Sequence, residues 1–184
     1  MSLTNQHIDA LIVLCKQGNQ LAQLEVYNRY QQAMFNVSHR IVKDTAEAED
    51  IMQESFITAF SKIDSFKGDA TFGSWLKRIV INNSLTQYRS SSRYTKVSDE
   101  NITDTTVMDH ETSYQEDYSA IRAKQMMECM DQLHPSYSNI LTLHFIEGYD
   151  YEELCDILDI SYANCRTMLS RAKTSLRKKL SIAV

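Results

Sequence analysis

Glycine and proline are scarce in this chain of 184 residues, which contains 4 glycines and 1 proline. A β-sheet protein needs turn residues at each hairpin, and glycine and proline are among the residues that most often supply them. Helices joined by short connections need fewer. The scarcity therefore disfavours a sheet protein and predicts an all-α fold.

Long apolar runs are also missing. The N-terminus lacks a basic region, and its apolar stretch, residues 10–15, is too short for the core of a secretory signal. No segment approaches the roughly 20 apolar residues that a membrane-spanning helix needs. We therefore expect a cytoplasmic protein that does not insert into a membrane.

Motifs for metals and cofactors are absent from the sequence. The four cysteines show neither CxxC nor CxxH spacing, and the five histidines form no set with metal-ligand spacing. There is no glycine-rich phosphate loop. We expect the scattered cysteines to be small buried hydrophobic side chains in a reducing compartment. The sequence thus predicts no metal site, no cofactor and no catalytic site.

The net charge of −5 is distributed unevenly along the chain. Residues 1–97 contain 11 Lys/Arg against 9 Asp/Glu, whereas residues 98–118 contain seven acids and no Lys or Arg. Residues 119–160 are acidic again, and residues 161–184 contain six bases and no acid. Because salt screens charges beyond about 8–10 Å, a local basic face can bind nucleic acid despite the negative total.

The N-terminal part, residues 1–97, is expected to form a helical bundle. Apolar residues recur at helical spacing from Leu21 to Ile41 and predict one long helix that ends near residue 43. Asp44 with Glu47 indicates the N-cap of a second helix, which reaches Ile63. A short loop, residues 65–69, precedes a third helix over residues 72–85. Amphipathic helices with short connections are typical of a bundle.

An acidic segment follows, residues 98–118, and it has no apolar periodicity. Its composition predicts a flexible linker, with a polar surface helix as the alternative. We therefore expect a second domain over residues 119–184.

Four helices are expected in that second domain. The first spans the apolar residues from Ile121 to Leu133, and Pro135 starts the second, which ends near Ile146. The last two helices, residues 150–158 and 162–180, are separated by a three-residue turn and predict a helix-turn-helix motif. Asp150 with Glu153 again resembles a capping box.

The last helix has two chemically different faces. Its apolar face is expected to contain Cys165, Leu169, Ala172, Leu176 and Leu180. The opposite face contains Asn164, Arg166, Thr167, Ser170, Arg171 and Lys173. Arginine can bridge a guanine edge or a phosphate, which favours DNA binding. A solvated basic face on an ordinary helix is the alternative.

The segment FKGDATFGSWLKRI, residues 66–79, places aromatic residues among basic ones where a loop meets a helix. Bases of single-stranded DNA stack on aromatic rings while cations contact the phosphates, so this mixture suits a melted strand. The alternative is that Phe72 and Trp75 belong to the core, and for Trp75 we favour the core.

Together the two halves resemble a known family. The chain is similar to sigma factors of the extracytoplasmic-function (ECF) group, which are sigma-70 family subunits of RNA polymerase. The resemblance covers nearly the whole chain. AEAEDIMQESFITAFSKIDSFKGDATFGSWLKRIVINN resembles the family's region 2, and LHPSYSNILTLHFIEGYDYEELCDILDIS with CRTMLSRAKTSLRKKL resembles its region 4 helix-turn-helix.

The resemblance implies a promoter-specific initiation factor that is not an enzyme. Its implied partners are core RNA polymerase, through the clamp helices of the largest subunit and the flap, promoter DNA and an anti-sigma factor. Asp50, Gln53 and Glu54 fall where the family docks on the clamp helices.

Two DNA-binding sets follow from the same resemblance. In the family the melted −10 element is read by a loop and helix that flip a base into a pocket. The matching residues here are Lys67, Phe72, Arg78 and Asn82. The −35 element is read in the major groove by the residues that match Arg166, Thr167, Ser170 and Arg171.

Four positions depart from the family pattern, and one of them, Cys155 in place of a usual small apolar residue, is expected to be neutral. Ala163 and Asn164 stand where the family usually has Gly-Thr, and Met168 stands where it commonly has a base. The missing cation removes about one phosphate contact. The −35 preference is therefore less firmly predicted than the −10 role.

Two other classes of protein are alternatives. A conventional helix-turn-helix regulator would dimerise on palindromic sites, and it would leave the aromatic-basic segment without a role. A small nuclease would need carboxylates clustered at a basic cleft to hold a metal ion. The acids of this chain lie instead in the expected linker and on outer helix faces.

Overall fold

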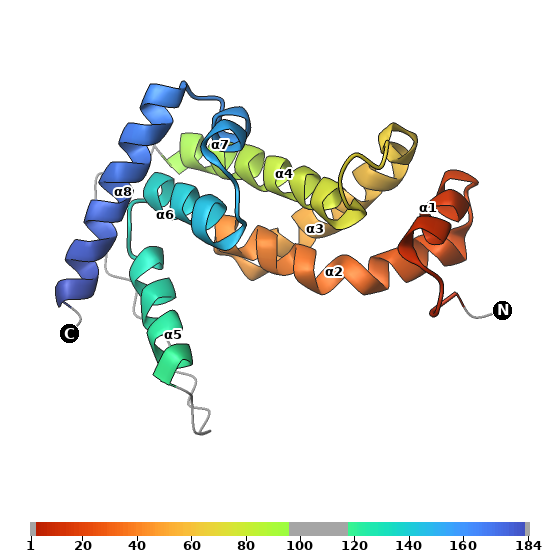
Figure 1. Cartoon of the computed structure of the whole chain (residues 1–184), viewed down its shortest axis with the longest axis horizontal. Coiled ribbons are helices and arrows are strands. Elements are labelled where there is room, and N and C mark those ends of the chain that lie inside the picture. The colour runs from red at the N-terminus through yellow and green to blue at the C-terminus, as the bar shows by residue number, and fades with distance from the viewer. Residues whose placement is uncertain (1–2, 96–117, 183–184) are drawn as a thin grey trace. The chain divides into compact units, whose positions relative to one another are not determined.

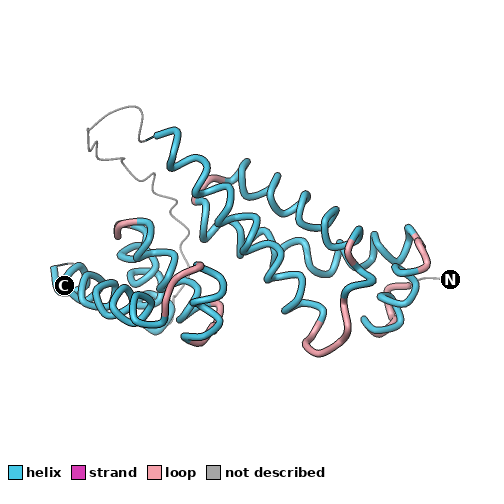
Figure 2. The backbone as a smooth tube through the Cα atoms, turned by 90° about the horizontal axis from the view of Figure 1, so that it is seen from above, coloured by secondary structure: helices cyan, strands magenta, loops and turns pink. Residues whose placement is uncertain are grey.

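A computed structural model describes residues 3–95 and 118–182. Every regular element in these two ranges is helical (Figure 1), as the tube in Figure 2 also shows. The prediction of an all-α chain is therefore confirmed. The chain forms two compact units, Met1–Asp99 and Glu100–Val184. Almost all of the predicted linker lies outside the described residues, but its last residue, Tyr118, begins a helix.

The described part of the first unit contains four α-helices and one short 3₁₀ turn. The elements are α1 (Ile8–Lys16), α2 (Gln20–Val42), α3 (Thr45–Ser61), η1 (Ile63–Ser65) and α4 (Phe72–Thr95). The long helices α2, α3 and α4 pack against one another, and α1 packs on α2 (Figure 1). Their shared core includes Leu11, Val26, Leu76, Val80 and Ile81, which are fully buried.

Local capping sets the ends of these helices. The Asn19 side chain accepts a hydrogen bond from the Ala22 amide at 3.1 Å and starts α2. Asp44 accepts from the Glu47 amide at 2.8 Å, as the sequence predicted for α3. Between them, Lys43 has a left-handed backbone with φ of 64°, which ends α2.

The helix α1 was not predicted from the sequence. At nine residues it is too short to be stable alone, because helix nucleation is costly. Its stability comes from packing, since Leu11, Ile12 and Cys15 are buried against the rest of the unit. Only part of the apolar run that is too short for a secretory signal faces inward, since Val13 is exposed on the outer side of this helix.

The second unit contains α5 (Tyr118–Asp131), α6 (Pro135–Leu141), η2 (Thr142–Ile146), α7 (Tyr151–Leu158) and α8 (Tyr162–Ile182). Helix α8 contacts α5, α6 and α7. Pro135 is the first residue of α6, as predicted. The prediction of one α-helix up to Ile146 is wrong, because η2 is a π-turn in which the Glu147 amide bonds to the Thr142 carbonyl at 3.0 Å.

Side-chain caps mark where the two helices of the helix-turn-helix begin, and the cap of α7 is reciprocal. The Glu153 amide donates to the Asp150 carboxylate at 2.8 Å, and the Asp150 amide donates to the Glu153 carboxylate at 3.0 Å. The predicted capping box is therefore present. Asp159, with φ of 55°, ends α7, and the Ser161 hydroxyl accepts from the Asn164 amide at the start of α8.

In the described part of the chain, none of the helices has the length and apolar character needed to cross a bilayer.

Leu169 provides a test of this packing. It is fully buried where α8 packs on the second unit, so Leu169→Ala should lower the free energy of unfolding of that unit by about 2–5 kcal/mol. Trp75 is the single tryptophan and reports on the first unit. In denaturant titrations, part of the circular-dichroism transition should move to lower denaturant while the Trp75 fluorescence transition stays in place. An unchanged circular-dichroism curve would contradict the assigned core.

Candidate nucleic-acid and protein interfaces

The exposed face of α3 contains the three residues predicted to bind a protein partner. Asp50, Gln53 and Glu54 are all exposed, whereas Ile51, Met52, Ser55 and Phe56 are buried on the opposite side. The same exposed face continues to Ile57, whose surface is 71% exposed. Ile57 therefore adds one exposed apolar side chain to the carboxylates of this face. The sequence analysis did not single out Ile57.

A groove of about 320 Å³ runs beside this face between α3 and α4. Asp50 and Glu54 line it from α3, and Asn83 and Thr86 line it from α4. The Asn83 side-chain amide donates to the Ser55 hydroxyl at 3.0 Å and joins the two helices below the groove. The acidic edge of α3 is thus held against α4 in a fixed orientation.

An aromatic cluster supports the loop between η1 and α4. The ring centroid of Phe72 lies 5.7 Å from those of Phe66 and Trp75, and 5.5 Å from that of Tyr30. Burial raises the pKa of Tyr30. Gly73 allows the close packing, because an added Cβ would lie 3.1 Å from the Tyr30 ring.

This cluster places Phe72 in the core, with 3% of its surface exposed. A base could stack on Phe72 only if the ring left the cluster. Of the two roles considered for Phe72, base stacking and core packing, the structure therefore favours core packing. Trp75, for which the core was favoured, is only partly buried and keeps one part of its side chain accessible. Between these two aromatics, Trp75 is the one that a ligand can reach.

The other three residues predicted to bind the melted strand are accessible. Lys67 is exposed on the loop, next to Gly68, whose φ of 85° makes the turn. Arg78 is half-buried and Asn82 is exposed, one turn apart on the same face of α4. The ammonium of Lys16 in α1 donates to the Phe66 carbonyl at 3.1 Å, so α1 also holds the loop.

Helix α8 presents the predicted DNA-binding face to solvent. Arg166, Thr167, Ser170 and Arg171 are all exposed. Cys165, Leu169 and Ala172 are fully buried, and Leu176 is nearly so. The Thr167 hydroxyl donates to the Ala163 carbonyl at 2.9 Å and can still accept a hydrogen bond from a ligand. The two faces predicted from the sequence are therefore present up to Leu176, whereas Leu180, also predicted for the apolar face, is only half-buried.

Residues beside this face extend it onto α6. Asn164, Thr167 and Arg171 line a shallow groove together with Ser136 and Tyr137. Met168, which replaces a basic residue of the family pattern, is half-buried in the same groove. Lys173 is not simply solvated, because its ammonium lies 5.1 Å from the centre of the Phe145 ring.

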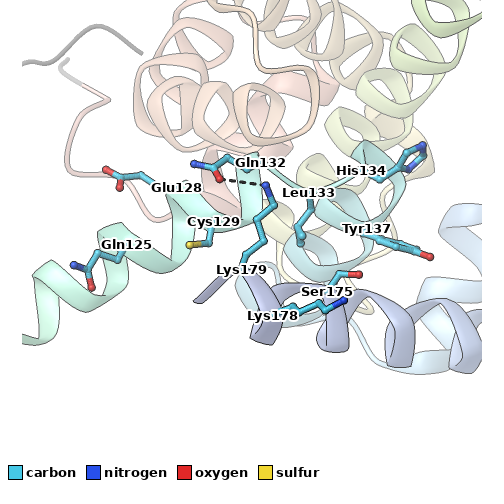
Figure 3. Close-up of a pocket in the computed structure, with 10 residues that line it drawn as sticks. All are labelled: Gln125, Glu128, Cys129, Gln132, Leu133, His134, Tyr137, Ser175, Lys178 and Lys179. Carbon is cyan, nitrogen blue, oxygen red and sulfur yellow. Dashed lines mark hydrogen bonds between the residues drawn. The ribbon is translucent and has the colours of Figure 1, made fainter. Parts of the chain in front are cut away.

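A larger pocket of about 670 Å³ lies in the second unit (Figure 3). Cys129 and Leu133 line its wall, and the Lys179 ammonium donates to the Gln132 side chain at 3.3 Å beside it. None of the predicted site residues lines this pocket. Periodicity could not reveal it, because it forms where α5, α6 and α8 meet.

Metal ligands do not gather in the described residues, where no group of three His, Cys, Asp or Glu side chains is suited to hold an ion. Cys15, Cys129 and Cys165 are buried, as expected, and Cys155 is half-buried.

Comparisons with known proteins match both units. Residues 26–94 match Sigma-70 region 2, and residues 123–176 match Sigma-70, region 4. The RNA polymerase sigma-H factor of Pseudomonas aeruginosa is 26% identical over 97% of this chain and 96% of its own length. The ECF RNA polymerase sigma-E factor of Haemophilus influenzae is 28% identical over the same shares.

A solved structure supports the fold. The sigma factor RpoE in complex with the anti-sigma factor NepR, from Bartonella quintana, superposes with a TM-score of 0.61 at 20% identity, covering 86% of this chain and 96% of that one.

Proposed function

The chain belongs to the extracytoplasmic-function group of the sigma-70 family of RNA polymerase sigma factors, and on this basis we propose that it contacts core polymerase and two promoter elements through separate surfaces. Residues 1–97 bind core polymerase and the melted −10 strand, and residues 119–184 bind the −35 duplex. Residues 98–118 link the two. The protein acts in the cytoplasm and needs no catalytic site of its own.

The exposed acidic face of α3 is the proposed polymerase-binding surface. Asp50, Gln53 and Glu54 offer carboxylates and an amide on one rigid helix, and Ile57 adds apolar area next to them. Basic or amide groups on a partner helix would complement this face. Interfaces of this kind gain specificity from the charges and much of their affinity from central apolar contacts.

The loop before α4 and the exposed face of α4 are the proposed −10 surface. Lys67 and Arg78 can contact phosphates, and the Asn82 amide can hydrogen-bond to the edge of an unstacked base. Phe72 supports this surface from inside, through its contacts with Phe66 and Trp75. We therefore assign Phe72 a positioning role.

The exposed face of α8 is the proposed −35 surface, and it is the observation that best supports DNA binding. Arg166 and Arg171 are exposed on α8, and the opposite side of this helix is buried in the core. Their side chains can therefore enter a major groove while the second unit stays folded. Thr167 and Ser170 lie between them and add hydrogen-bonding groups.

Separate surfaces on two linked units explain how modest contacts can give firm promoter binding. Once one unit is bound, the linker keeps the other at a high effective concentration near its own site. An anti-sigma factor could occupy the same surfaces. The relative from Bartonella quintana was solved with such a factor, and we extend this partner class to the present chain.

Binding of core RNA polymerase separates this function from that of a conventional helix-turn-helix regulator. Tagged chain should retain purified core polymerase, and the double substitution Asp50→Ala/Glu54→Ala should reduce the amount retained by about tenfold or more. Glu49→Ala is the matched control, because Glu49 is an acid of the same helix that lines a different groove, beside Gln31 and Gln32. Failure of the unmodified chain to retain polymerase would contradict the proposal.

Arg171→Ala tests the −35 surface. Because Arg171 is exposed, the loss of its contact should weaken binding to a −35 duplex by roughly 1–3 kcal/mol without unfolding the protein. Fluorescence anisotropy of labelled duplex, with holoenzyme, measures the change. Arg122→Ala is the control, since Arg122 is an exposed arginine of the same unit but belongs to α5 and not to α8. Equal affinities for Arg171→Ala and the unmodified protein would refute the groove assignment.

Asn82→Ala tests the −10 surface. We expect about a tenfold loss of open-complex formation, because one contact with an unstacked base disappears, with little change in duplex capture. Permanganate reactivity of unpaired thymines reports the melting. Asn36→Ala is the control, since Asn36 is an exposed asparagine of the same unit but lies on α2. Equal losses of capture and melting in Asn82→Ala would indicate a purely structural residue.

A further inference from the structure

Two cysteines meet inside the helix-turn-helix. Cys155 of α7 and Cys165 of α8 are neighbours where these two helices pack together. The Cys165 sulfur also lies 4.0 Å from the Tyr151 carbonyl oxygen of α7. The proposed function gives neither thiol a role.

The backbone geometry brings these two thiols together. Tyr151 precedes Cys155 by four residues, so both lie on one face of α7. Side chains of an α-helix lean toward its N-terminus, and the Cys155 thiol is therefore directed back over the turn of Tyr151. The sulfur of Cys165 lies at that same turn.

The two thiols differ in their access to solvent. Cys165 is fully buried, whereas Cys155 is half-buried. Burial, and then the neighbouring Cys155, raise the pKa of Cys165 to about 11. Cys165 therefore stays a protonated thiol at neutral pH, and a small oxidant from solvent reaches Cys155 first.

We propose that Cys155 and Cys165 form a reversible disulfide on exposure to hydrogen peroxide and that this bond weakens promoter binding. Peroxide oxidises the Cys155 thiol to a sulfenic acid and releases one water. The sulfur of Cys165 then attacks the sulfenic sulfur, its proton leaves with the displaced hydroxyl as a second water, and the S–S bond forms. Two thiols are oxidised while one peroxide is reduced to two waters.

The effect on DNA follows from the position of Cys165, and this part of the inference rests on the proposed −35 surface. A disulfide fixes the two sulfurs about 2.05 Å apart, closer than two thiols in contact, and so pulls α8 toward α7. Cys165 immediately precedes Arg166 and Thr167, which share its helical turn. These two side chains move with it and lose their fit to the groove.

The experiment uses the full chain, oxidised with hydrogen peroxide and desalted before core polymerase is added. A protease that cleaves before aspartate cuts the chain at Asp156 and Asp159 and so places the two cysteines on different peptides. If these two peptides stay joined until a reductant is added, the disulfide is identified. Anisotropy with promoter duplex should show about a tenfold loss of affinity that dithiothreitol reverses. Cys155→Ser should keep its affinity through the same treatment.

Each outcome distinguishes a different claim. Absence of joined Cys155 and Cys165 peptides overturns the pairing, whatever happens to DNA binding. Joined peptides with unchanged promoter affinity overturn the switch. If the reduced protein itself fails to bind the promoter, the proposed function fails, and peptide mapping still decides the disulfide independently.

Discussion

The packing of α8 against α6 and α7 determines which side chains of the last helix reach the solvent. Leu169 and Ala172 are fully buried in this contact, and the helical repeat then leaves Arg166 and Arg171 on the outside. The DNA-binding face is therefore a geometric consequence of the hydrophobic core beneath it. The capping box at Asp150 and the left-handed residue Asp159 set where α7 starts and ends, and so fix how α8 begins.

The first unit uses the same principle with aromatic side chains. Phe72 is buried among Phe66, Trp75 and Tyr30, and this cluster holds the loop that exposes Lys67. The core contributes to function through position, while exposed polar groups make the contacts. A residue can thus match a DNA-binding motif in the family and still serve mainly to support its neighbours.

Much of the fold could be predicted because its long helices have clear apolar periodicity and local caps, as at Asp44 and Asp150. The face of α8 followed from the same pattern. The features that were missed depend on tertiary contacts: α1 is too short to be stable by itself, and the π-turn at Thr142 leaves no periodic signal. The burial of Phe72 and the approach of Cys155 to Cys165 join residues from neighbouring turns or different helices, which spacing alone does not reveal.

Transcription in vitro tests the central claim most directly. Core RNA polymerase is incubated with genomic DNA, with and without this protein, and the 5′ ends of the transcripts are mapped. The account predicts new start sites that share two sequence elements at a fixed spacing, since two linked units contact one promoter at separate places. Initiation at the same sites and levels with and without the protein would contradict it.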